Sequence, residues 1–402
     1  MKPRINTNAH RCFHPCATVF ICDLTCFEAT MADARHRRPN HLEIDNDSVT
    51  RRVAALRRRV GPRVKIFAAL KADGYGFGTL PMARAALAGG ANALSLIDRA
   101  EAIMLREAGI DAPILLYAGA PLDAEAVAAA AAHRLILTVL SEGDVDLVAR
   151  HARTPVELAI KLEAGAERIG VLPGQLVACA DRIARQRNLS LEIVNAHPTF
   201  SDDVPDTVVR EQFRRFVAAV DRLKELDRPM PMRLFASSRT LGRLPGMELD
   251  AVDPGQYLFA DTSELPIIRS LHTVLTQVRP VTRDFAPEHA PFGIATVRRL
   301  GVIPFGRVDG GGRCHAAEVL VRGQRARLLA SPSLEYMRLD LTPIDNAEAG
   351  DPVMLIGRQD GAQISLAEVC AAQGATPSDL AMAIGPAVLR TWHAGHGRHG
   401  GG

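Results

Sequence analysis

The sequence has few aromatic residues and no marked excess of charge of either sign. Aromatic residues make up 4% of its 402 residues, and 48 basic residues face 45 acidic ones, for a net charge of +3. Without a basic surplus or stacking side chains, nothing indicates nucleic-acid binding. Long hydrophobic runs are also absent, since runs such as residues 126–132 are far too short to span a membrane. We therefore expect a soluble enzyme of about two to three domains.

The seven cysteines do not indicate a disulfide framework. Four lie at positions 12, 16, 22 and 26, whereas Cys179, Cys314 and Cys370 are scattered singly. An odd number of dispersed cysteines is typical of a reducing compartment, which predicts a cytoplasmic location. The spacing of the N-terminal cysteines is compatible with a zinc knuckle, but this segment has no other sign of a fold, so we predict no metal site.

Both ends of the chain are expected to be tails. Met31 begins the segment Met-Ala-Asp-Ala-Arg, shortly before a first strand-like pattern at residues 41–45. We interpret residues 1–36 as an N-terminal tail that reflects a mis-assigned start, and we favour Met31 as the start. Residues 393–402 are rich in glycine and histidine and are predicted to be a disordered tail.

Between the tails, strand and helix patterns alternate. Apolar runs begin at residues 64, 93, 113, 135, 156, 191, 232 and 251, and helical patterns such as residues 98–108 and 209–226 separate them. This order predicts an α/β fold in which residues 37–271 form a (β/α)8 barrel, with a doubly wound sheet as the alternative. Residues 272–392 are predicted to form a mostly β C-terminal domain, with strands near 274–281, 295–302, 317–321, 326–329 and 353–356 and a helix near 365–372.

Lys71 is the first candidate for chemistry. It follows the apolar run at residues 64–70 and begins the segment Lys71-Ala-Asp-Gly-Tyr-Gly-Phe-Gly78. Active sites of such barrels lie at the carboxyl ends of the strands, and a desolvated lysine there has a lowered pKa and a nucleophilic amine. The structural alternative is a lysine that extends its ammonium group to solvent from a strand end.

Other strand ends carry polar or small residues. Arg168 follows the strand that contains Lys161, His197 ends the run 191–196, and Ser237, Ser238 and Gly255 follow the last two strands. Because these strand ends meet at one face of a barrel, they predict a single pocket, and the small residues at the last strands suit a phosphate.

With these motifs, the sequence resembles the alanine racemase family, the fold-type III pyridoxal-phosphate enzymes, from about residue 41 to residue 392. The segment 71–78 is similar to the cofactor-lysine motif of the family. Further similar segments are residues 161–170, 195–197, 237–238, 252–255, 306–310, 339–342 and 350–353.

The resemblance implies a role for each matching residue. Lys71 would form the Schiff base with pyridoxal 5'-phosphate, and Arg168 would contact both the cofactor and the substrate carboxylate. His197 would support the pyridine ring. The phosphate would be bound by Tyr75, Ser238, Gly255 and Gln256. The resemblance also implies a substrate contact at Leu334 and a head-to-tail homodimer with shared active sites.

Three departures from the family coincide with the chemistry. Arg307 stands where the family has its catalytic tyrosine, and a guanidinium is a poor base but a good ligand for a carboxylate. Asp253 replaces the arginine that faces the pyridine nitrogen, so it would favour a protonated nitrogen. Glu335 replaces an aspartate beside the tyrosine, and Pro386 replaces a tyrosine that contacts the phosphate. We assign Arg307 and Glu335 to the catalytic group together with Lys71.

Three functions follow from this comparison. The first is an amino-acid racemase in which Lys71 serves one face of the substrate and Tyr336 or Tyr257 the other. The second is a different pyridoxal-phosphate reaction on an amino acid, such as decarboxylation, transamination or elimination. The third is a non-catalytic pyridoxal-phosphate-binding protein. The sequence leaves the identity of the amino acid open.

Overall fold

The computed structural model describes residues 38–199, 203–226, 230–259, 265–282, 296–313, 315–329 and 331–393. The expected N-terminal tail, its four cysteines and the start at Met31 lie outside the described residues, and so do residues 394–402. Within these ranges, none of the helices has the length and apolar character needed to cross a membrane. The same ranges hold no cluster of three or more histidine, cysteine or carboxylate side chains that could bind a metal.

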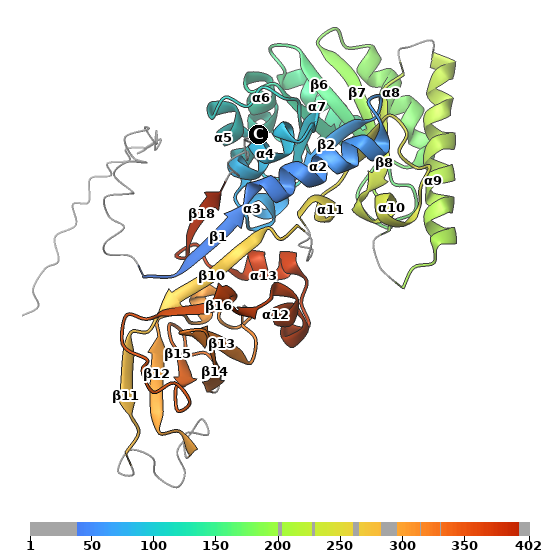
Figure 1. The fold of residues 1–402 in the computed structure, drawn as a ribbon. Coiled ribbons are helices and arrows are strands. Elements are labelled where there is room, and N and C mark those ends of the chain that lie inside the picture. The colour runs from blue at the N-terminus through green and yellow to red at the C-terminus, as the bar shows by residue number, and fades with distance from the viewer. Residues whose placement is uncertain are drawn as a thin grey trace, which may run out of the picture. The chain divides into compact units, whose positions relative to one another are not determined.

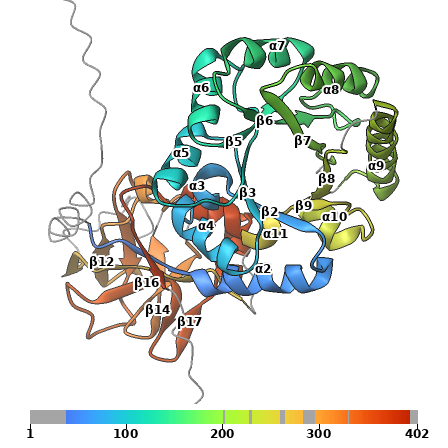
Figure 2. The same ribbon diagram turned by 90° about the horizontal axis from the view of Figure 1, so that it is seen from above.

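Eight parallel strands form a closed barrel (Figures 1 and 2). In order they are β2 (Lys65–Ala69), β3 (Ala93–Leu96), β4 (Ile114–Leu116), β5 (Leu135–Val139), β6 (Val156–Lys161), β7 (Leu189–Asn195), β8 (Met232–Ser237) and β9 (Ala251–Asp253). Each strand falls on one of the eight apolar runs, so the barrel prediction is confirmed and the doubly wound alternative is wrong. The runs are continuous because strands covered on both faces bury both sets of side chains.

Helices surround the barrel, as Figure 2 shows. They are α2 (Asn46–Val60), α3 (Lys71–Tyr75), α4 (Thr79–Ala88), α5 (Arg99–Glu107), α6 (Ala124–Ala132), α7 (Glu142–His151), α8 (Leu176–Ala184), α9 (Asp206–Asp221), α10 (Ser238–Arg243) and α11 (Gln256–Phe259). Several of these helices begin with a residue whose side chain caps the helix by accepting a hydrogen bond from a backbone amide. For example, Asp98 accepts a hydrogen bond from the Ala100 amide at 2.7 Å, and Ser141 accepts one from the Asp144 amide at 3.1 Å.

The barrel interior is filled by one side chain from each strand: Phe67, Ala93, Leu115, Ile136, Ala159, Ile193, Leu234 and Ala251. The barrel is therefore a packed core rather than a pore. Side chains on a strand alternate between faces, so the residues two positions further on again point inward, toward the carboxyl ends. Several of these are polar: Ser95, Tyr117, Thr138, Lys161, Asn195 and Asp253. We call these six residues the polar layer.

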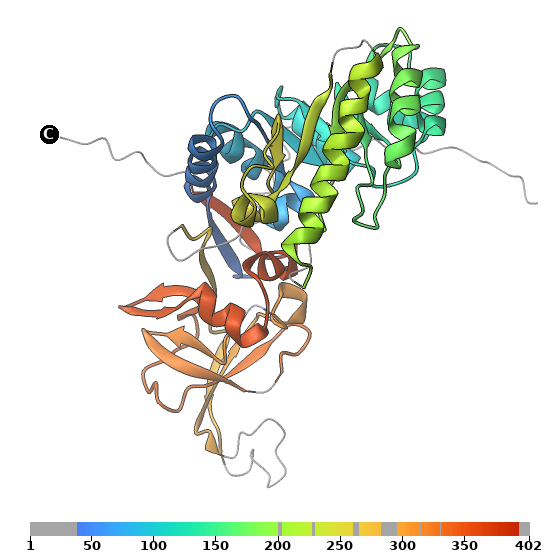
Figure 3. The same cartoon turned by 90° about the vertical axis from the view of Figure 1, so that its right-hand side faces the viewer.

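A second sheet has the strand order β11-β12-β15-β14-β13-β16-β10-β1-β18, with β17 paired to β16 (Figures 1 and 3). Its strands are β1 (His41–Asp45), β10 (Ile268–Val274), β11 (Gln277–Pro280), β12 (Arg299–Ile303), β13 (Glu318–Val321), β14 (Gln324–Leu329), β15 (Met337–Asp340), β16 (Pro352–Gln359), β17 (Ala362–Ile364) and β18 (Leu389–His393). Helices α12 (Leu366–Gln373) and α13 (Pro377–Ala383) accompany it.

The division of the chain differs from the expected one. Strand β1, expected in the barrel part, pairs antiparallel with β10 and parallel with β18 in the second sheet. The expected boundary between residues 271 and 272 falls inside β10, and His393, expected in the tail, ends β18. These pairings join residues more than 200 positions apart, so local sequence patterns do not reveal them.

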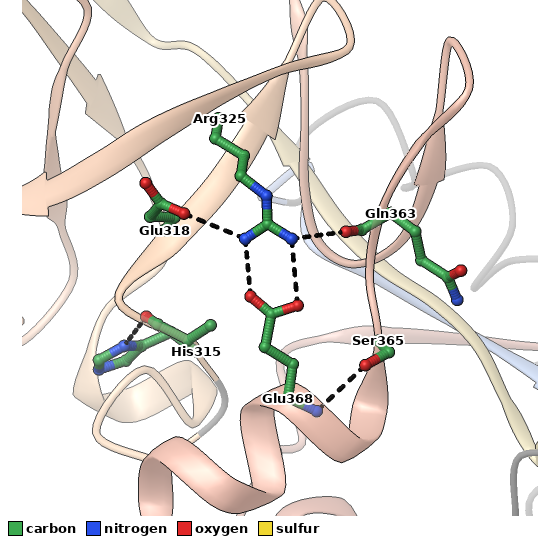
Figure 4. Close-up of polar contacts among 7 residues, drawn as sticks. His315, Glu318, Arg325, Gln363, Ser365 and Glu368 are labelled. Carbon is green, nitrogen blue, oxygen red and sulfur yellow. Dashed lines mark hydrogen bonds and ion pairs between the residues drawn. The ribbon is translucent and has the colours of Figure 1, made fainter.

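Ion pairs join two strands of the second sheet to helix α12. Arg325 on β14 pairs with Glu318 on β13 at 3.0 Å and with Glu368 on α12 at 2.7 Å (Figure 4). Ser365 caps the same helix by accepting a hydrogen bond from the Glu368 amide at 3.1 Å. The two arginine bonds to Glu368 are bidentate, which fixes the direction of the side chains.

Candidate active site

Lys71 begins a left-handed turn at the carboxyl end of β2. Ala72, Asp73, Gly74 and Tyr75 have φ angles of 50°, 53°, 58° and 58°. A left-handed conformation costs about 1–2 kcal/mol for each residue that has a Cβ atom. Such strain persists only where surrounding contacts enforce it, and it is concentrated at functional sites.

The C-terminal elements α13 and β18 supply contacts to this turn. Trp392 donates from Nε1 to the Phe77 carbonyl at 2.6 Å, and Arg390 donates from Nε to the Gly76 carbonyl at 3.1 Å. A Cβ atom on Gly76 would lie 2.5 Å from the carbonyl oxygen of Ala381 on α13. The turn that carries Lys71 is therefore fixed partly by the last described residues of the chain.

The predicted barrel residues meet at one cavity of about 220 Å³. Its lining includes all eight residues that the resemblance assigned to the cofactor: Lys71, Tyr75, Arg168, His197, Ser238, Asp253, Gly255 and Gln256. Ala69 and Ser237 complete the lining. The strand order of a closed barrel brings these residues together, although they are spread over almost 190 positions of the sequence.

One side of the cavity is suited to an oxyanion. Ser238 Oγ accepts hydrogen bonds from the amides of Gly255 and Tyr257 at 2.9 and 3.1 Å, which leaves its own hydroxyl hydrogen available. The Tyr75 hydroxyl lies so close to Gly255 that it leaves no room for a Cβ atom at that position. Ser237 Oγ is buried and has no hydrogen-bond partner among the described residues. Because Ser237 also lines the cavity, this hydroxyl is available to a ligand bound there.

Two basic groups of the site have strongly lowered pKa values. Burial lowers the pKa of Lys161 to about 7, against the attraction of the Asp253 carboxylate. Burial, together with the charges of Lys161 and Lys71, lowers the pKa of His197 to about 3. His197 is therefore neutral at physiological pH, and its Nδ1 lies 2.7 Å from the Pro198 carbonyl, so this nitrogen carries the proton.

Asp253 provides a carboxylate to the lining of the cavity. Ser95 donates a hydrogen bond to Oδ1 at 2.7 Å, and the Tyr117 hydroxyl donates to Oδ2. The ring centroid of Tyr117 lies 5.0 Å from Lys71 Nζ. Ser95, Tyr117 and Lys161 were not among the site residues predicted from the sequence. Their inward orientation could have been predicted from the sequence, since each stands two positions after an inward-facing apolar residue of its strand.

The predicted residues of the second domain form a separate group. The Arg307 amide donates to the Ser333 carbonyl at 3.0 Å, so Arg307 lies beside the segment that carries Leu334, Glu335 and Tyr336. Leu334 is 56% exposed and Tyr336 is 45% exposed. None of these residues lines the Lys71 cavity within one chain, and neither does Tyr257. The structure thus brings together the barrel part of the predicted site but not the second-domain part.

Fold and site together define a barrel enzyme with a lysine and several hydroxyl groups in one cavity at the carboxyl ends of its strands. Two family models match the chain: the alanine racemase N-terminal domain over residues 44–263 and the alanine racemase C-terminal domain over residues 289–392. The chain belongs to the alanine racemase family, as the sequence resemblance predicted.

Individual relatives agree with this assignment. Alanine racemase from Desulfosudis oleivorans is 30% identical over 87% of this chain and 95% of its own length. The corresponding protein of Desulfovibrio desulfuricans is 29% identical over 88% and 98%. Among solved structures, alanine racemase from Bacillus anthracis with bound L-Ala-P has 26% identity and a TM-score of 0.76, covering 89% of this chain and 95% of that one.

Proposed function

We propose that this protein is a pyridoxal-phosphate-dependent amino-acid racemase. The main support is the single cavity in which Lys71 lies with the seven other residues that the family assigns to the cofactor. The side chains that line the cavity also match the chemical groups of pyridoxal phosphate. It combines an amine for the aldehyde, hydroxyl groups for the phosphate, and a carboxylate for the ring nitrogen.

Each barrel residue has a specific task in this proposal. Tyr75 and Ser238 bind the phosphate, and burial together with Asp253 raises the pKa of Tyr75 to about 12, so its hydroxyl remains a donor. Arg168 binds the substrate carboxylate, and neutral His197 supports the ring without adding charge. Bound pyridoxal phosphate supplies an electron sink for the Cα of the substrate. Lys71 anchors the cofactor and moves the Cα proton on one face.

The second face requires groups from elsewhere, because Arg307, Leu334, Glu335 and Tyr336 do not line the cavity of their own chain. We propose a head-to-tail homodimer in which this exposed segment completes the cavity of the partner subunit. Tyr336 has a phenol that can exchange a proton, whereas Arg307 has no acceptor and is suited to the substrate carboxylate. The cytoplasmic location stays a prediction.

The test is the incubation of purified protein with pyridoxal phosphate and L-alanine in deuterated water, followed by chiral separation and mass analysis. Deuterated D-alanine is the expected product. Lys71→Ala should abolish it, whereas Lys65→Ala should not. Lys65 is a matched control because it is an exposed lysine at the other end of the same strand, β2. Equal activity of the wild-type and Lys71→Ala proteins would exclude the proposed mechanism.

A different pyridoxal-phosphate reaction is the second candidate, and Asp253 is the observation that favours it. A carboxylate held by two hydroxyl donors favours a protonated ring nitrogen and a longer-lived carbanion, which permits other outcomes. In that case deuterium would enter L-alanine without formation of the D-isomer. Bound cofactor with no exchange for any amino acid would instead support the non-catalytic alternative.

A further inference from the structure

Four adjacent barrel strands bring Lys71 together with Asp253, Ser95 and Tyr117. Strand β2 pairs with β9 on one side and with β3 on the other, and β3 pairs with β4. The Ala69 amide donates to the Pro254 carbonyl at 3.0 Å, and the Leu70 amide donates to the Ser95 carbonyl at 2.8 Å. The backbone therefore fixes the relative positions of Lys71, Asp253 and Ser95.

Asp253 is a buried carboxylate whose hydrogen bonds come from neutral groups. It is 7% exposed, and the charge of Lys161 acts on it, but its two side-chain hydrogen bonds come from hydroxyl groups. Ser95 and Tyr117 each donate to one of its oxygens. A carboxylate can accept about four hydrogen bonds, so acceptor capacity remains on the side that lines the cavity. The free acceptor positions of this buried carboxylate therefore face the cavity, where a ligand can donate to them.

Tyr117 contacts two charged groups of the cavity, Asp253 and Lys71. Its hydroxyl donates to Asp253, and its ring lies at cation–π distance from the Lys71 ammonium group. Burial, followed by the nearby Asp253 charge, raises the pKa of Tyr117 well above its usual value. The phenol therefore remains a hydrogen-bond donor throughout the pH range in which an enzyme works.

We propose that Tyr117 and Ser95 are positioning residues that hold the Asp253 carboxylate as a fixed acceptor for the protonated ring nitrogen of pyridoxal phosphate. This inference rests on the proposed function, because it requires that cofactor. It assigns a task to two residues that have none in the racemase mechanism above. Without the two donors the carboxylate is free to rotate away, so the hydrogen bond that would stabilise the protonated ring nitrogen is weakened.

The test uses the holoenzyme loaded with pyridoxal phosphate that carries a heavy nitrogen isotope in its ring. The chemical shift of that nitrogen reports its protonation directly, without turnover. We expect a protonated signal in the wild type at neutral pH. In Tyr117→Phe and in Ser95→Ala the midpoint of its titration should fall by about one pH unit, and it should fall further in the double variant. Tyr117→Phe keeps the ring beside Lys71 and removes only the hydroxyl.

Thr138→Val is the matched control. Thr138 belongs to the same polar layer, and its buried hydroxyl forms no hydrogen bond among the described residues, so its loss should leave the nitrogen signal unchanged. An unprotonated nitrogen in the loaded wild type would overturn the inference, and so would wild-type signals in both Tyr117→Phe and Ser95→Ala. Failure of the wild type to bind the cofactor, measured by its visible absorbance, would overturn the proposed function and this inference together.

Discussion

The half-buried lysine of the polar layer, Lys161, makes the stability of the fold depend on pH, and the size of this effect follows from its pKa. Lys161 ends β6, and its pKa is lowered from 10.5 to about 7, mainly by burial. The unfolded chain therefore holds this proton up to about pH 10.5, whereas the folded protein releases it near pH 7. Between these values unfolding takes up a proton, so this group makes the fold more stable as the pH rises.

The size of the effect follows from the same two values. The two pKa values differ by about 3.5, and one pKa unit corresponds to about 1.4 kcal/mol. A charged Lys161 therefore lowers the free energy of unfolding by about 5 kcal/mol. Lys161→Met, which keeps the length of the side chain without the charge, should remove this cost. We expect the cofactor-free variant to be several kcal/mol more stable than the wild type near pH 6. The advantage should shrink by about 3 kcal/mol toward about pH 9.

Urea unfolding of both proteins across this pH range is the assay, with Lys65→Met as the control for an exposed lysine of the barrel. In the control, the stability difference from the wild type should not depend on pH. Loss of the Lys161 charge should also raise the pKa of His197, which adds to the advantage in acid. A Lys161→Met advantage that is constant or grows from pH 6 to pH 9 would refute the reasoning.

Three further predictions concern the turn at Lys71 and the second-domain segment. Gly76→Ala should destabilise the protein by about 1–3 kcal/mol more than Gly61→Ala, because both glycines have positive φ but only Gly76 faces a backbone oxygen. Thermal unfolding of the two variants measures this difference. Equal losses of stability would contradict the prediction. Arg307→Ala should raise KM about 10-fold to 100-fold with cofactor affinity unchanged, and an unaltered KM would remove Arg307 from the substrate site. Tyr336→Phe should slow Cα deuterium exchange about 100-fold on one face only, and normal exchange on both faces would exclude this tyrosine.

The sequence by itself determined the barrel and its lysine. Eight apolar runs separated by amphipathic helices specify eight parallel strands, because strand and helix periodicities are local properties of the chain. The sharp turn after Lys71 could also be predicted from the sequence, since the glycines at positions 74, 76 and 78 have positive φ angles that glycine adopts most readily. Because all strand ends meet at one face of a barrel, the cavity lining could be predicted from single positions such as Arg168 and His197.

Tertiary structure alone decided the remaining features. Strand β1 lies in the second sheet because it pairs with β10 and β18, and no local pattern identifies partners so distant in sequence. The hydrogen bond by which Trp392 supports the turn after Lys71 also joins residues that are far apart in the sequence, so no local pattern reveals it. The lowered pKa of Lys161 and the hydrogen bonds from Ser95 and Tyr117 to Asp253 depend on burial and on distances across neighbouring strands. Sequence patterns specify which face of a strand a residue occupies, but only barrel closure determines which side chains meet there.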